Sequence, residues 1–290
     1  MQRPAADARA PTRAGLAALR DRPGIPPEYL DFRLRLHDLQ WNAWDTLVAR
    51  RPAGAVRPAA AGGPVSPADL ALDDDLLRGL LESVAAALPA RVEPEAGART
   101  LLEAMRRSPP RLREIAIAAS FDPVEAVLEV DAARSGCSVD ALLFFGRVLA
   151  APFVAEAVSR PGRNGAPDPT APVVRCPACG ATAGLAVISG ERGARTLCCS
   201  LCGTSWASPR AHCPFCGGTT ALGSLEEAGE RERWLETCGE CRRYILTVDA
   251  RAPGRRGPVL PLVEVVAGLY LDLIAETHGC RRGLPYAALV

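Results

Sequence analysis

Apolar residues recur at helical spacing through most of the first 160 residues. The spacing predicts a helix over 31–49, which also carries two tryptophans, and another over 73–88 with a stripe of leucine and valine. Three aspartates begin the second of these helices, where negative charge suits the helix dipole. Shorter helices are predicted over 97–107 and 110–120.

Two start signals divide the rest of this half. Asp122 and Pro123, followed by a glutamate at the third helical position, fit the start of a helix that ends near Gly136. Ser138 then caps a helix to about Val158 that is apolar nearly all round. Such a helix is typical of the centre of a bundle, so this half is predicted to be an all-α domain.

The pattern changes after the helical half. Residues 161–172 contain four prolines and two glycines, the strongest boundary signal in the chain. Beyond them, short β-like runs at 185–188 and 244–248 alternate with pairs of cysteines. A last amphipathic helix is predicted over 261–277, with Gly279 ending it. The sequence does not say whether this helix packs on the helical domain or on the cysteine-rich part.

The predicted fold class is α+β: an all-α N-terminal domain, two tandem small rubredoxin-like or zinc-ribbon metal modules, and a C-terminal helix. The predicted boundaries are a flexible tail over 1–22, a helical domain over 23–160, a linker over 161–172, metal modules over 173–210 and 211–252, and a closing helix and tail over 258–290.

Eight of the eleven cysteines form four Cys-x-x-Cys pairs within 66 residues. Two intervening residues let one tight turn direct both thiolates at a single ion, and a glycine after three of the pairs tolerates positive φ. Within each unit, 19 or 21 residues separate the two pairs, which leaves room for a strand, a turn and a returning strand. The predicted ligand sets are Cys176, Cys179, Cys199 and Cys202 for one ion, and Cys213, Cys216, Cys238 and Cys241 for the other; interleaved pairing is the alternative.

Sites made of sulfur alone suit Zn²⁺ or a single rubredoxin-type Fe. Four cysteines can also hold an iron–sulfur cluster, although the spacing fits two mononuclear ions better. Spacing does not distinguish zinc from iron. Modules this small bury little apolar surface, so metal binding is expected to supply much of their folding free energy.

Other cysteines and histidines have simpler interpretations. Cys198 adjoins Cys199 and competes with it as a ligand, but the following Cys-x-x-Cys-Gly turn favours Cys199. His212 precedes a predicted ligand and is expected to be structural, with tuning of the neighbouring thiolate as the alternative. The residues expected to be inert or structural are Cys137, Cys280, His37 and His278.

The charge pattern argues against several functions. All 34 basic residues are arginine, which removes Schiff-base lysines and the lysine of a phosphate-binding loop. Between residues 173 and 250, eight arginines stand against eight acids, whereas a nucleic-acid-binding module normally has clustered positive charge. A zinc-ribbon nucleic-acid-binding protein is therefore a minor alternative. No catalytic triad or carboxylate pair is evident, so no catalytic residue and no enzyme activity is predicted.

The sequence also bears on location. It contains no run of 18 apolar residues and no secretory signal at its N-terminus, so no membrane insertion is predicted. Clustered thiols meant for a metal fit a reducing compartment. The expected location is the cytoplasm.

The cysteine-rich part resembles the formate dehydrogenase accessory protein family, FdhE. The resemblance is carried by residues 175–180, 199–206, 213–216 and 236–244, and by 262–273 followed by Gly279. It is close over the four cysteine pairs and the last helix, and general over the helical half. Cys198 departs from the family, in which histidine often stands at that position.

The resemblance implies a cytoplasmic, non-catalytic accessory protein that binds the catalytic subunit of a molybdenum- or tungsten-dependent formate dehydrogenase during maturation. It also implies two rubredoxin-like modules that bind iron through the eight paired cysteines. The alternative from another class is an iron–thiolate redox or sulfur-handling protein that acts on a metalloenzyme. Oligomeric state is left open.

Overall fold

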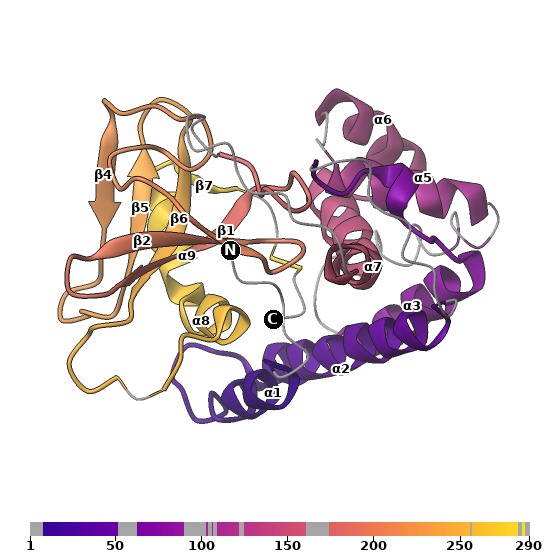
Figure 1. Cartoon of the computed structure of the whole chain (residues 1–290), viewed down its shortest axis with the longest axis horizontal. Coiled ribbons are helices and arrows are strands. Elements are labelled where there is room, and N and C mark those ends of the chain that lie inside the picture. The colour runs from indigo at the N-terminus through magenta and orange to yellow at the C-terminus, as the bar shows by residue number, and fades with distance from the viewer. Residues whose placement is uncertain are drawn as a thin grey trace.

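A computed structural model describes residues 8–51, 63–89, 103, 106, 109–121, 125–160, 174–255, 257–283 and 286–287. The predicted linker over 161–172, most of the predicted helix over 97–107 and the start signal at Asp122 lie outside the described residues. The α+β class is confirmed. A helical half stands beside a sheet half that carries the last helices (Figure 1).

The helical half surrounds one apolar helix. Its elements are α1 (Arg9–Ala17), α2 (Pro27–Ala49), the short 3₁₀ helix η2 (Pro67–Asp69), α3 (Asp74–Ala87), α5 (Pro109–Ser120), α6 (Glu125–Ser135) and α7 (Val139–Ser159). Asp73 caps α3 by accepting a hydrogen bond from the Leu76 N–H, and Ser138 caps α7 in the same way. Helix α7 is buried along most of its length and packs against α2 and α5, as its all-round apolar pattern predicts.

Helix α7 also passes a test for membrane spans. In the part of the chain that the structure describes, it is the one helix long and apolar enough to cross a membrane, and 89% of its 18-residue window is buried inside the protein. The core helix of a globular domain passes the same test.

Helix α1 corrects the expected flexible tail over 1–22. Leu16 on this helix is fully buried, and Arg9 forms an ion pair with Asp45 of α2 at 2.6 Å. Pro11 does not prevent the helix, because the first turn has no intrahelical partner for its N–H. The tail prediction therefore fails for Arg9–Ala17, while residues 1–7 lie outside the described residues.

The two cysteine-rich modules share a single sheet. Its strands are β1 (Ala183–Ser189), β2 (Ala194–Cys199), β3 (Ser205–Ala207), β4 (Leu222–Leu225), β5 (Arg233–Cys238), β6 (Arg243–Asp249) and β7 (Arg281–Arg282). The strand order is β3-β2-β1-β6-β5-β4, with β7 paired to β6. Pairs within each module are antiparallel, whereas β1 and β6 pair in parallel, with Leu185 opposite Leu246. This pairing joins the two modules into one continuous sheet.

The closing helix is broken into two. One continuous helix is predicted over 261–277, but the structure has α8 (Pro261–Ala267) and α9 (Leu269–Thr277) with Gly268 between them. A Cβ atom on Gly268 would lie 2.8 Å from Leu246 Cδ2, so a larger residue there would have to displace the Leu246 side chain of β6. Gly279 ends α9 at φ 62° in a Schellman turn, as predicted.

The two halves share one hydrophobic core. Buried side chains run without a break from α2 and α7 to the cysteines of the first module. The Val65 N–H donates to the Ala178 carbonyl at 2.7 Å, and the Gln40 amide donates to the carbonyls of Val148 and Ala287. Helix α8 contacts both α1 and, through Glu264, Arg233 of the sheet.

Candidate metal centres

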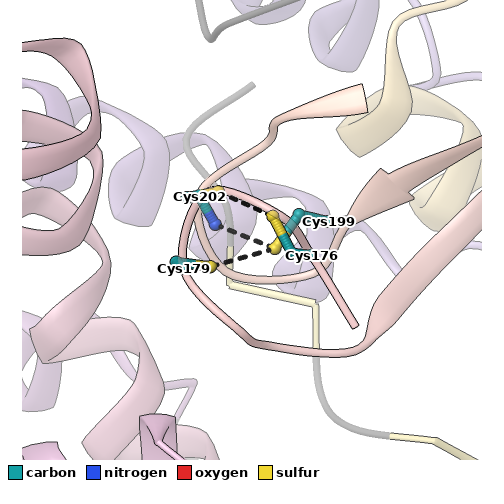
Figure 2. A group of neighbouring side chains, drawn as sticks. All are labelled: Cys176, Cys179, Cys199 and Cys202. Atoms are coloured by element: carbon teal, nitrogen blue, oxygen red, sulfur yellow. Dashed lines mark hydrogen bonds between the residues drawn. The ribbon is translucent and has the colours of Figure 1, made fainter. Parts of the chain in front are cut away.

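The first four cysteines converge on one point at the edge of the helical half (Figure 2). Their Sγ atoms all lie within 4.8 Å of one another. The Cys176 and Cys202 sulfurs are 3.6 Å apart, and those of Cys179 and Cys199 are 3.5 Å apart. A tetrahedron with metal–sulfur bonds of about 2.3 Å has edges of about 3.8 Å, so the spacing suits one tetrahedral ion.

Tight turns hold these sulfurs in place. The Gly180 N–H donates to the Cys176 carbonyl at 2.8 Å, and Gly180 takes φ 74°, a conformation that favours glycine. The backbone N–H groups of Leu201 and Cys202 each donate to the Cys199 sulfur at 3.4 Å. Such donors stabilise a thiolate and orient it toward a bound ion.

The second set of four repeats this geometry at the surface. The Cys213 and Cys241 sulfurs are 3.7 Å apart, and those of Cys216 and Cys238 are 3.8 Å apart. The Phe215 N–H donates to the Cys213 sulfur at 3.4 Å. Cys216 is exposed, whereas all four cysteines of the first set are buried. The two clusters therefore differ mainly in access to solvent.

The fourth turn uses arginine where the others use glycine. Arg242 follows Cys241 and takes φ 57°, the only positive φ of a non-glycine residue in the described ranges. Its backbone N–H donates to the Cys238 carbonyl at 2.9 Å, and its side chain donates to the His278 carbonyl at the end of α9 at 3.2 Å. These contacts hold the strained turn and link the second cluster to α9.

The electrostatics of the first cluster call for a cation. Burial raises the pKa of the Cys176 thiol well above its usual value. Burial acts in the same direction on Cys199, but thiols of the other three cysteines donate hydrogen bonds to its sulfur and hold its pKa well below the usual value. One buried thiolate can form in this way, but four would repel one another. A divalent ion removes that conflict by stabilising all four thiolates, so the donor set fits a metal.

An arginine from the helical half reaches the first cluster. Arg147 of α7 is 0% exposed, and its guanidinium donates to the Ser200 hydroxyl at 2.6 Å, beside Cys199. Burial lowers its pKa to about 10, while the nearby thiols of Cys199 and Cys179 act to raise it. A filled site with four thiolates and one divalent ion carries negative charge that would stabilise this buried cation. No sequence signal marked Arg147, because its partner lies 53 residues away.

Among the described residues, two kinds of side chain lie outside both clusters: Cys198, the competing ligand candidate, and the cysteines and histidines expected to be inert or structural. Cys198 accepts a hydrogen bond from the Ser205 hydroxyl at 3.3 Å, and burial raises its pKa to about 11. The His37 ring accepts a hydrogen bond from the Trp41 indole at 3.1 Å, and burial lowers its pKa. The remaining members of this group are Cys137, Cys280, His212 and His278.

The structure thus groups the eight paired cysteines as the spacing predicts, and each group could hold one ion. Their role as ligands, and the choice between iron and zinc, stay predictions.

Comparison with known proteins adds a family. The profile described as "FdhE, central domain" matches residues 175–210, which hold the first cluster. A protein FdhE homolog of Edwardsiella ictaluri is 31% identical over 264 residues, covering 88% of this chain and 80% of the relative. Other matches are shorter: the homolog of Aquifex aeolicus is 34% identical over 36% of this chain, and the aligned part covers 38% of that relative.

A solved structure shares the fold. The crystal structure of the FdhE protein from Pseudomonas aeruginosa matches with a TM-score of 0.63 and 23% identity, covering 99% of this chain and 98% of that chain. The likeness therefore extends beyond the cysteine-rich part to the helical half, for which the sequence showed only a general resemblance.

Proposed function

The chain belongs to the FdhE family, and from this premise we propose that it is a non-catalytic accessory protein for the maturation of formate dehydrogenase. Its partner is the catalytic subunit of a molybdenum- or tungsten-dependent formate dehydrogenase, which it meets in the cytoplasm. The family relationship over most of both chains is the observation that carries this proposal.

The metal centres fit an accessory role because bound ions would make the two modules rigid. Cys176, Cys179, Cys199 and Cys202 would hold one ion, and Cys213, Cys216, Cys238 and Cys241 the other, with iron favoured and zinc the alternative. Bound ions supply folding free energy that modules of this size lack. The turns on each cluster then hold the strands of the shared sheet in register and present a fixed surface to a partner.

Affinity capture from the native host tests the proposal. Tagged full-length protein should recover the formate dehydrogenase catalytic subunit, and deletion of the gene should abolish most formate oxidation until the wild-type gene is restored. As a matched control, Arg35→Glu changes an exposed arginine on α2 and should capture the subunit equally well. The proposal fails if no subunit is captured and deletion leaves formate oxidation intact.

Exposure of the second cluster favours one other function. Cys216 is exposed and Cys241 half-buried, so a bound iron would lie near solvent, where electron exchange with another protein is possible. Reversible bleaching of rubredoxin-like bands in an anaerobic optical spectrum would support this redox function. Colourless protein with two zinc ions per chain would contradict it and leave the accessory role in place.

A further inference from the structure

A pocket of about 610 Å³ lies beside the second cysteine cluster. Its floor includes Trp234 and Glu236 of β5 and Ser224 of β4, which share one face of the sheet. Arg233 of β5 points the opposite way and pairs with Glu264 of α8. Helices α8 and α9 therefore cover the other face and leave this one open. We name this hollow the Trp234 pocket.

In the described lining of the pocket, more arginines than glutamates lack an ion pair, although Arg243 lies over the Phe215 ring at 6.0 Å and Arg210 acts on the Asp249 carboxyl. Glu236 is already paired with the buried Arg195 at 2.7 Å, and Glu230 contacts Arg233 and Tyr270. Within the described part of the chain, three arginines of the lining have no carboxylate within 4 Å: Arg210, Arg231 and Arg243. Glu226 is the one lining glutamate there without an ion pair.

These charges are placed at both ends of the pocket. Cys213 and Cys238 line one end, where a filled second site would add negative charge. Arg243 lies opposite Cys238 on β6 and offsets that charge. Arg231 precedes β5 at the other end of the strand, together with Glu230, which pairs with Arg233, and Glu226, which follows β4.

The pocket also reaches the free edge of the sheet. Strand β4 is last in the strand order, on the side away from the helical half (Figure 1), and Leu222 on it is 39% exposed. Trp234 on the floor is half-buried. A partly exposed tryptophan beside arginines is a composition enriched in the centres of protein interfaces. An extended segment that crosses this face of the sheet would place its side chains against Trp234.

We propose that the Trp234 pocket binds an extended acidic segment of a partner protein, next to the second cysteine cluster. Charge complementarity with the unpaired arginines selects the acidic segment, and Trp234 supplies apolar contact. The inference rests on the proposed accessory function, in which the chain has a protein partner, and it names the surface and the chemistry of that contact.

The test uses full-length protein and a fluorescein-labelled ten-residue peptide of alternating Asp and Val, followed by fluorescence anisotropy. The double variant Arg210→Glu, Arg231→Glu should weaken binding by about tenfold or more, because each reversal replaces an attraction with a repulsion. The matched control is Arg35→Glu, Arg134→Glu, which makes the same charge change at exposed positions of α2 and α6. The control should bind as the wild type does.

A second measurement locates the peptide. An unlabelled acidic peptide should shift the tryptophan fluorescence of the wild type, and Trp234→Phe should remove that shift. Equal weakening in both double variants, equal affinity for an alternating Lys and Val peptide, or a shift that survives Trp234→Phe would overturn the proposal. Failure here alongside successful capture of the catalytic subunit would reject this surface and keep the proposed function.

Discussion

Arg147 brings a full charge into the interior, next to four cysteines that the sequence places in a different domain. The guanidinium donates to Ser200 and, at 3.4 Å, to the Ala119 carbonyl. Burying a cation is costly unless negative charge lies nearby, and a filled first site would provide it. At the residue scale, the metal centre and the helical half are therefore coupled through one side chain.

Arg147→Met tests this coupling. In the metal-loaded protein the change should lower the free energy of unfolding by about 3 kcal/mol, because the filled site loses its buried counter-charge. In the chelated protein the loss should be much smaller, since the buried cation then has less negative charge to offset its desolvation. Denaturant unfolding with and without a chelator measures both. An equal loss in the two states would show that Arg147 acts only through packing.

At the scale of elements, the closing helix shows how contact with another element overrides a local pattern. Apolar spacing over 261–277 is helical throughout, and both α8 and α9 are indeed helical. At the break, a Cβ atom on Gly268 would lie 2.8 Å from Leu246 Cδ2 of β6, so the two elements pack closely there. The periodicity predicts which face of the helix is apolar. Whether the helix continues in one direction depends on the element against which that face packs.

Gly268→Ala should destabilise the protein by about 1 to 3 kcal/mol, because the added methyl group overlaps the Leu246 side chain. The matched control is Gly79→Ala in α3, where an added Cβ meets nothing within 4 Å. That change should stabilise the protein by up to about 1 kcal/mol, since alanine favours a helix over glycine. Thermal or denaturant unfolding of both variants measures these changes in stability. Equal changes in the two variants would contradict the predicted overlap with Leu246.

On the scale of the whole molecule, the two clusters belong to different environments. The first lies in the core that includes α2 and α7, and the C-terminal residues also reach it, since the Ala287 N–H donates to the Ser200 carbonyl at 2.8 Å. The second lies at the surface. The first module is therefore not expected to fold independently of the helical half.

Cys176→Ala and Cys241→Ala should therefore destabilise different sets of elements. Loss of a first-cluster ligand should raise hydrogen exchange in β1, β2 and also α7, because these share one core. Loss of Cys241 should raise exchange mainly in β4 to β6. Hydrogen exchange followed by mass spectrometry separates the two patterns. Protection of α7 that survives Cys176→Ala unchanged would contradict a shared core.

The sequence by itself determined most of the helices, two of the strands and the grouping of cysteines, since these depend on short-range spacing. Ser138 caps its helix as expected, and each Cys-x-x-Cys turn is local chemistry that the chain encodes within a few residues. What only the tertiary structure decided depends on residues distant in the chain: the parallel pairing of β1 with β6, the docking of α1, the break at Gly268, and the contact of Arg147 with Ser200. Such contacts follow from the packing of a shared core, which no local pattern records.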